Sequence, residues 1–199
     1  MATPMLRRNV PLVLLLCGLS AFTSCLKSKN PVTDPKKGGR DEALCGVWKY
    51  KDKEGILWLF QLGYLESNLK APWMGCTFTS NDGTDHSSSF APCFVSIVAG
   101  KKYLNLASGL DMTQDQISKE PSLLEKISEY EIVKYEIKDE TLTLTMSNSV
   151  SLDDSFSKGL IKGDDEMITS SSEELASFLE KYDQKVFPVK ENVRFTKVK

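Results

Sequence analysis

Alternation of apolar and polar positions is clearest in the second half of the chain. Leu142, Leu144 and Met146 fall on one face of residues 141–146, and a turn at 138–140 joins this segment to an apolar-rich run over 130–137. Two period-two segments around a short turn predict a β-hairpin. Similar runs predict further strands at 46–51, 56–62, 73–79, 93–98, 102–106 and 193–198, and shorter ones near 160–161 and 167–168. A polar loop is expected over 80–89, with Asp82-Gly83 as its turn.

Helical spacing is confined to two regions. Ser171 and Glu174 form a capping box, and apolar side chains then recur on one helical face, at Leu175, Phe178, Leu179 and Tyr182. Residues 111–129 look helical in part, with Pro121 opening a turn. About eight to ten short strands with one late amphipathic helix predict a mainly β fold, a small antiparallel β-barrel or a tight sandwich.

The first 24 residues have a pattern of their own. Arg7 and Arg8 precede an apolar run over 10–22, and the small residues Thr23 and Ser24 then lead to Cys25. The apolar run is shorter than the about 20 residues that cross a bilayer. This order of positive, apolar and small residues is typical of a secretory signal, so residues 1–24 are expected to be a signal peptide.

The segment Phe22-Thr23-Ser24-Cys25 resembles the lipobox of bacterial lipoproteins. That resemblance implies cleavage before Cys25, a thioether-linked lipid on its sulfur, and a partner that is the membrane itself. Leu26 follows the cysteine where an Asp would favour the inner membrane, so the resemblance favours an outer-membrane location in the cell envelope. Two alternatives stay open: an ordinary cleaved signal with an incidental cysteine, and modification at Cys17, which the bulky Leu16 disfavours.

Composition divides the rest of the chain in two. Residues 25–43 have no apolar periodicity and are rich in charge, Pro and Gly, which predicts a lipidated cysteine followed by a flexible tether. Residues 44–199 are long enough for one domain with its own core.

Several function classes are disfavoured. The chain has 25 Lys and Arg against 27 Asp and Glu, with no basic stripe, so no nucleic-acid partner is expected. His86 is the only histidine and no C-x-x-C occurs, so no metal site is expected. No phosphate-binding glycine loop is present, and no cofactor is expected. The chain is therefore expected not to be an enzyme, and a hydrolase would need polar groups that only the fold brings together.

Three cysteines, Cys45, Cys76 and Cys93, follow Cys25. In an oxidising compartment some of them are expected to pair. Cys76 and Cys93 lie in β-like runs on either side of a polar turn, so they are the favoured disulfide. Cys45 would then be a buried thiol.

The segment Leu44-Cys45-Gly46-Val47-Trp48 resembles the Gly-x-Trp signature of lipocalins, and of lipocalin-like domains in bacterial lipoproteins. The resemblance implies that Gly46 and Trp48 close one end of a barrel and that Arg194 lies across the Trp48 ring. Trp48 as an ordinary core residue of another β fold is the open alternative.

Aromatic residues gather in the early strands. Trp58, Phe60, Trp73 and Phe78 are the predicted lining of a cavity for a small hydrophobic or amphipathic ligand. The expected function is thus a lipid-anchored binding module. The alternative is a protein–protein interaction module with a filled core, which predicts a large exposed apolar patch.

Overall fold

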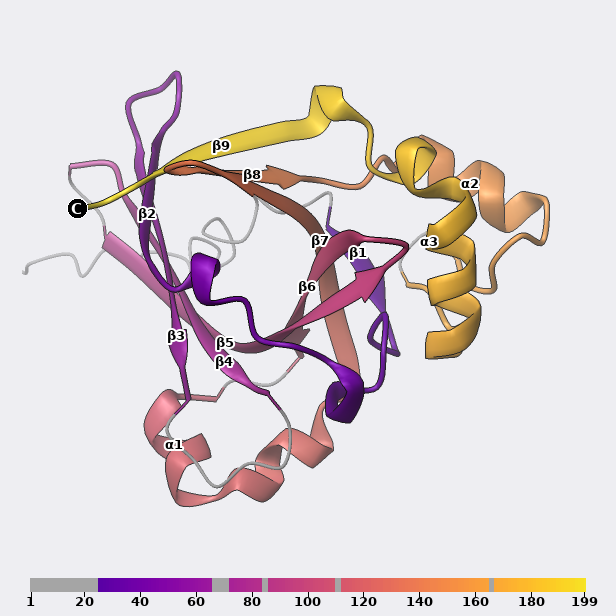
Figure 1. The fold of residues 1–199 in the computed structure, drawn as a ribbon, viewed down its shortest axis with the longest axis horizontal. Coiled ribbons are helices and arrows are strands. Elements are labelled where there is room, and N and C mark those ends of the chain that lie inside the picture. The colour runs from indigo at the N-terminus through magenta and orange to yellow at the C-terminus, as the bar shows by residue number, and fades with distance from the viewer. Residues whose placement is uncertain (1–24, 66–71, 84–85, 110–111, 165–166) are drawn as a thin grey trace, which may run out of the picture.

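The computed structural model describes residues 25–65, 72–83, 86–109, 112–164 and 167–199. The predicted signal peptide, residues 1–24, lies outside the described residues. Within them, eight antiparallel strands close into a barrel, which confirms the predicted fold class (Figure 1). The barrel strands are β2 (Gly46–Lys51), β3 (Leu57–Tyr64), β4 (Met74–Asn81), β5 (His86–Val98), β6 (Lys101–Ser108), β7 (Glu129–Lys138), β8 (Thr141–Thr145) and β9 (Asn192–Lys197).

Each barrel strand pairs with the next one along the chain, and β9 pairs back onto β2 with Trp48 opposite Lys197. The predicted hairpin is confirmed as β7 and β8, with Leu142 opposite Ile137 and Leu144 opposite Tyr135. Closure gives every barrel strand two neighbours along at least part of its length, so the barrel has no long open edge.

The helices occupy the connections. The predicted late helix is confirmed as α3 (Ser172–Val186), and its capping box joins Ser171 and Glu174 as expected. The helical region before β7 holds α1 (Gln114–Lys119) and the short 3-10 helix η5 (Pro121–Lys126). The remaining 3-10 helices are η3 (Pro35–Lys37), η4 (Glu42–Leu44) and η6 (Val189–Glu191).

The connection between β8 and α3 departs from the expectation. The sequence did not predict α2 (Ser149–Ser157), which begins after the N-cap Asn148. The short strands predicted near 160–161 and 167–168 are not formed in the described residues, where isolated bridges join Ile168 to Gly163 and to Ser28. Serine and aspartate dominate α2, so its helical pattern is weak in the sequence.

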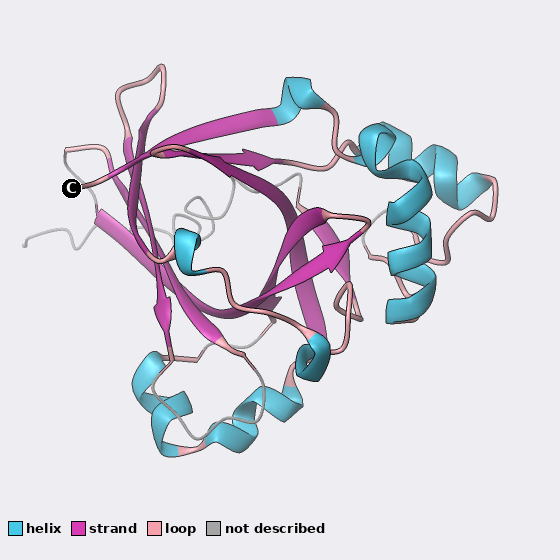
Figure 2. Cartoon of the chain, in the orientation of Figure 1, coloured by secondary structure: helices cyan, strands magenta, loops and turns pink. Residues whose placement is uncertain are grey.

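Two separate hydrophobic clusters hold the fold. One fills the barrel, with Trp48, Phe60, Leu104 and Leu142 almost fully buried. The other lies outside the barrel wall, where α3 packs over β1, β5, β6 and β7 (Figure 2). Strand β7 serves both, because its side chains alternate between the inner cluster at Val133 and Tyr135 and the outer one at Tyr130 and Ile132. Both clusters are built from residues between Cys25 and Phe195.

The segment predicted as a flexible tether is folded, and that prediction has to be corrected. Strand β1 (Leu26–Ser28) pairs with β7, with Leu26 opposite Ile132, and Val32 is fully buried in the outer cluster. Further on, Asp41 accepts hydrogen bonds from Lys102 Nζ (2.7 Å) and Tyr135 Oη (2.9 Å). Leu26 and Val32 are isolated apolar residues among charges and give no periodicity, but both are buried against the outside of the barrel wall.

The predicted loop over 80–89 is also shorter than expected. Residues 86–89 continue β5, and a ladder of hydroxyl groups joins them to β4 through Ser80–Ser87 (2.7 Å) and Thr79–Ser88 (3.3 Å). Backbone pairing therefore extends these polar residues as a hairpin beyond the barrel wall.

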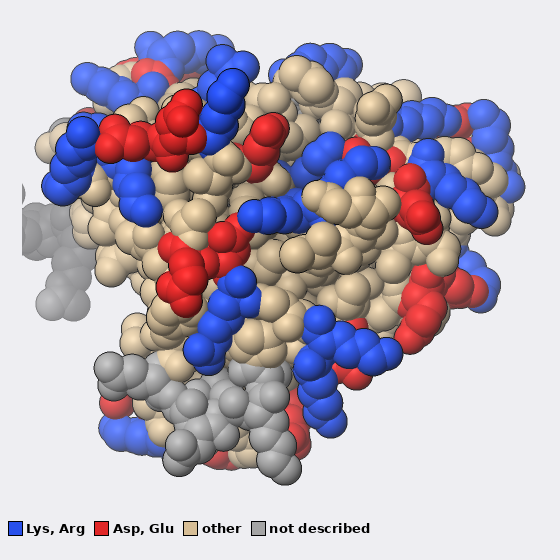
Figure 3. All heavy atoms as spheres, viewed as in Figure 1, with Lys and Arg blue, Asp and Glu red and all other residues tan. Residues whose placement is uncertain are grey.

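The two ends of the barrel differ. The closed end is the one at which β2 and β6 begin, and η4 lies across it in Figure 1. Leu44 of η4 is fully buried against the inner cluster. The mouth is the opposite end, where β6 ends at Ser108 and β7 begins at Glu129. Figure 3 shows the closed-end face, on which basic and acidic side chains are interspersed.

Candidate functional site

The closed end explains the Gly-x-Trp spacing. Trp48 lies wholly inside the barrel, and its indole N–H donates to the carbonyl of Leu44 (2.8 Å). Gly46 has a backbone φ of +125°, and a Cβ there would lie 3.2 Å from Lys197 Cε. Glycine therefore permits both the turn into β2 and the close passage of the Lys197 side chain.

The cation over Trp48 is Lys197, not Arg194. Lys197 Nζ lies 5.0 Å from the centre of the Trp48 ring, within cation–π range. Arg194 is exposed and pairs with Thr143, one position out of phase with the inward-facing Leu142 and Leu144. The prediction that Arg194 lies across the Trp48 ring was wrong. Side chains alternate along a strand, so Arg194, next to the inward-facing Phe195, points out of the barrel.

Three of the four predicted lining aromatics do face the interior. Trp58 stacks on Phe78 at 5.2 Å between ring centres, and Phe60 meets Phe78 edge-on at 6.1 Å. The Trp58 indole N–H donates to Asp52 Oδ2 (2.9 Å). Trp73 lies instead in the outer cluster, edge-on to Phe94 at 5.1 Å. The inward-facing rings thus fill one another's space.

The predicted disulfide is not formed. Cys76 and Cys93 are both buried free thiols on the neighbouring strands β4 and β5. Cys76 lies opposite Ala91 and Cys93 opposite Met74, so the two cysteines are diagonal neighbours. Diagonal positions are about 7–8 Å apart, beyond the usual Cα separation of a disulfide. Burial raises the pKa of both thiols, which keeps them protonated.

A pocket of about 580 Å³ opens at the mouth of the barrel, and we take it as the candidate site. Its lining comes from β1, the start of β7, the end of β6, α2 and the residues Asp164, Met167 and Ile168. Its polar wall is formed by Cys25, Lys27, Ser108, Glu129, Glu131, Ser147, Ser149 and Asp164. Its apolar wall is formed by Leu26, Leu152, Phe156, Met167 and Ile168. None of the predicted lining aromatics borders this pocket.

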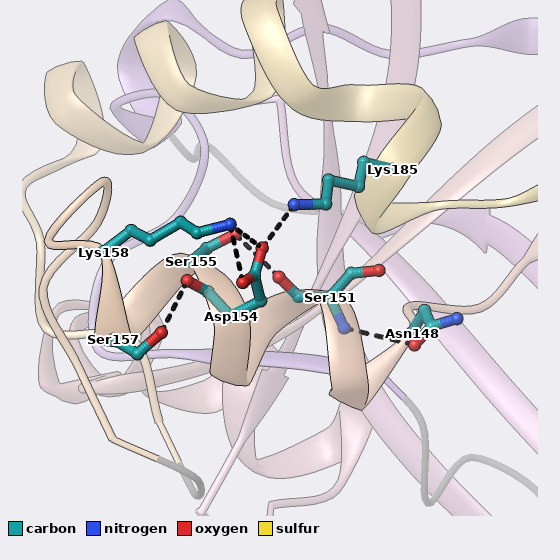
Figure 4. Close-up of polar contacts among 7 residues, drawn as sticks. All are labelled: Asn148, Ser151, Asp154, Ser155, Ser157, Lys158 and Lys185. Carbon is teal, nitrogen blue, oxygen red and sulfur yellow. Dashed lines mark hydrogen bonds and ion pairs between the residues drawn. The ribbon is translucent and has the colours of Figure 1, made fainter.

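The α2 wall is held in place by polar contacts (Figure 4). Asp154 of α2 accepts hydrogen bonds from Lys158, just after the end of α2, and from Lys185 of α3 (2.6 Å), and both lysines lower the pKa of Asp154 to about 2. Asn148 caps the first turn by accepting from the Ser151 amide. These exposed contacts join α2 to α3, while Leu152 and Phe156 of α2 pack against the outer cluster and border the pocket.

The polar wall has unusual electrostatics. Burial raises the pKa of Glu131, and nearby Lys27 offsets this only in part. Burial also raises the pKa of the Cys25 thiol, with Glu131 adding to the effect and Lys27 opposing it. Glu129 and Glu131 share the inner face of β7 with Val133, so their carboxylates point towards the mouth.

Sequence reasoning missed these carboxylates. Glu129 and Glu131 alternate with Tyr130 and Ile132. This pattern equally well predicts that Tyr130 and Ile132 face the barrel interior and that the two carboxylates face solvent. The outer face is in fact the one that α3 buries, and only the tertiary fold decides that.

No known protein family matches this chain, and neither a characterised protein nor a solved structure matches it. The fold and the pocket therefore stand on their own geometry. Among the described helices, none has the length and apolarity to cross a bilayer. The described residues also contain no group of three or more His, Cys, Asp or Glu side chains arranged to hold a metal ion.

Proposed function

We propose that the protein is a lipid-anchored binding module of the cell envelope, and that its ligand is a small amphipathic molecule held at the barrel mouth. The observation that carries this proposal is the mouth pocket. Its volume, about 580 Å³, falls within the range of about 300–1,000 Å³ typical of small-molecule sites. Its lining combines apolar side chains with carboxylates and hydroxyls, a combination that suits a molecule with one apolar and one polar part.

The position of Cys25 links the pocket to the proposed anchor. Cys25 lies on the pocket wall and is directly followed by β1. A lipid on its sulfur would therefore begin at the mouth with no spacer between lipid and barrel. In the proposal this arrangement holds the mouth against the membrane surface, so an amphipathic ligand can pass between the bilayer and the pocket. Part of the pocket volume would then border the glycerol end of the anchor.

A protein–protein interaction module is the second candidate. The filled barrel interior favours it, because the aromatic rings of Phe60, Phe78 and Phe195 pack on one another where a lipocalin-type ligand would sit. Among the described residues, large exposed apolar side chains are Leu57, Ile97, Val150, Leu160, Val189 and Val198.

Mass spectrometry of the full chain, extracted in mild detergent from bacterial membranes, tests the proposal. Denaturing spray should give a chain that begins at Cys25 with added lipid. Native spray should show a further small molecule that is lost on denaturation.

A matched variant locates the retained molecule. Ser149→Trp places a bulky side chain at an exposed position on the pocket wall and should abolish the retained mass without unfolding the barrel. Retention of the mass in this variant would contradict the mouth pocket as the site. A lipidated chain with no retained molecule under any condition would favour the interaction module.

A further inference from the structure

Two carboxylates at the mouth are not paired within the part of the chain that the structure describes. Neither Glu129 nor Glu131 makes a hydrogen bond or ion pair with any residue that the structure describes. Other shielded carboxylates of this protein are paired: Asp41 with Lys102, and Asp183 with Lys134. A partly buried carboxylate normally finds a donor or a cation, because removing its water without compensation is costly. The unpaired state of Glu131 therefore marks a place where a ligand group would be stabilised.

Lys27 is the one cation on the described pocket wall, and it does not pair with Glu131. Its backbone lies opposite Glu131 in the β1–β7 pairing, but its side chain is exposed and forms no ion pair within 4 Å with a described residue. Against this lysine stand the carboxylates of Glu129 and Glu131 in the same pocket lining. The pocket is thus acidic on balance, and an anionic head group would meet repulsion there.

Apolar side chains line the same pocket as these carboxylates. Leu152 and Phe156 come from one face of α2, four residues apart, and the Ile168 amide donates a hydrogen bond to the Lys27 carbonyl of β1 (2.9 Å). A ligand that satisfies both walls has an apolar part against α2 and a cationic part against β7.

We propose that the ligand is a cationic amphipath, with an amine or quaternary ammonium group that takes Glu131 as its counter-ion and Glu129 as a second acceptor. This inference rests on the proposed function, since it names the chemical class of the molecule held in the same pocket. The acidic wall supplies the selectivity, and the α2 wall supplies apolar contact common to any amphipath.

Calorimetric titration of residues 25–199 with three matched probes tests this inference. Decylamine, decanoate and decan-1-ol share one chain length and differ in the charge of the head group. Charge-assisted hydrogen bonds of this kind correspond to about ten-fold or more in affinity. Decylamine is therefore expected to bind about ten-fold more tightly than decan-1-ol, with decanoate the weakest.

Two Glu→Gln variants distinguish the effect of the Glu131 carboxylate from the effect of the net charge of the protein. Glu131→Gln should lower the affinity for decylamine by about ten-fold and leave decan-1-ol unchanged. Glu125→Gln, at an exposed position on η5 outside the pocket, removes the same charge and should change neither.

The outcomes distinguish the two proposals. Equal affinity for all three probes, or decylamine binding that Glu131→Gln does not weaken, would overturn the cationic assignment and leave the amphipath pocket standing. Failure of every probe to bind would overturn the proposed function itself.

Discussion

Asp183 is the residue whose replacement should weaken the fold most clearly. Its side chain is fully buried where α3 crosses the barrel wall. It accepts hydrogen bonds from Tyr103 Oη (2.7 Å) and Lys134 Nζ (2.7 Å), and Lys101 Nζ lies 3.2 Å away. One carboxylate thus joins α3 to both β6 and β7.

The magnitude follows from what each substitution leaves behind. Removing one partner of a buried ion pair costs about 3–5 kcal/mol. Lys101 and Lys134 keep side-chain exposures of 32% and 24%, so water can partly solvate both ammonium groups once the carboxylate is gone. Asp183→Asn also keeps an acceptor for Tyr103. We therefore expect a loss of about 2 kcal/mol for Asp183→Asn and about 3 kcal/mol for Asp183→Ala. Tyr103→Phe, which removes one donor only, should cost about 1 kcal/mol.

Urea unfolding followed by tryptophan fluorescence measures these losses as a shift of the midpoint at constant slope. The pH dependence gives a second readout. Burial acts to raise the pKa of Asp183, but the bonds from Lys134 and Tyr103 outweigh it and the pKa is lowered. The carboxylate therefore stabilises the fold above its unfolded pKa of about 3.9, and this contribution is lost as the pH falls through the lower folded value.

The difference in free energy of unfolding between the wild type and Asp183→Asn should therefore become smaller below about pH 4. An Asp183→Asn variant within about 0.5 kcal/mol of the wild type at pH 7 would refute the reasoning, since that is the range of an ordinary surface substitution.

Three further predictions concern other parts of the barrel. Gly46→Ala should destabilise the fold by about 1–3 kcal/mol because Gly46 has a positive φ. Gly63→Ala, where a Cβ meets nothing within 4 Å, should change the stability little. Equal urea midpoints for the two variants would contradict the account of the closed end. Cys76 and Cys93 should react with a maleimide only after unfolding, and a native mass two hydrogens below that of the reduced chain would show that one disulfide forms after all. Glu131→Gln should raise the thermal midpoint at pH 7, because the raised pKa of Glu131 means that its ionised form is disfavoured in the folded state. This gain in midpoint should vanish at a pH low enough to protonate Glu131 in both the folded and the unfolded state. A lower midpoint for the variant at pH 7 would contradict the unpaired state of Glu131.

Local sequence patterns predicted the elements that depend on neighbouring residues. The β7–β8 hairpin and α3 follow from alternation, helical spacing and a capping box, all of which lie within about 15 residues of one another. The barrel followed from the number and order of such elements, because a series of short antiparallel strands is best closed on itself.

The errors arise where the outcome depends on residues far apart in the chain. Leu26 pairs opposite Ile132, more than 100 positions away, so no local pattern marks β1 as a strand. The register of β4 against β5 keeps Cys76 and Cys93 apart, and the register of β9 decides that Lys197 rather than Arg194 reaches Trp48. Strand register is a tertiary property, and a shift of one residue moves a side chain to the other face.

The candidate site was missed for the same reason. Glu129 and Glu131 belong to β7, Leu152 and Phe156 to the unpredicted helix α2, and Cys25 to the segment predicted as a tether. Only the barrel brings these three parts together at one opening. The aromatic residues that the sequence did single out serve mainly to fill the interior.

The central claim is that the mouth pocket binds a small amphipathic molecule, and amide chemical-shift mapping tests it most directly. Decylamine would be titrated into isotope-labelled residues 25–199 and the shifted amides located on the fold. The account predicts shifts gathered at the mouth, around Lys27, Ser108, Glu131 and Phe156. Shifts centred on the closed end around Trp48, or on the interior around Trp58 and Phe78, would contradict it.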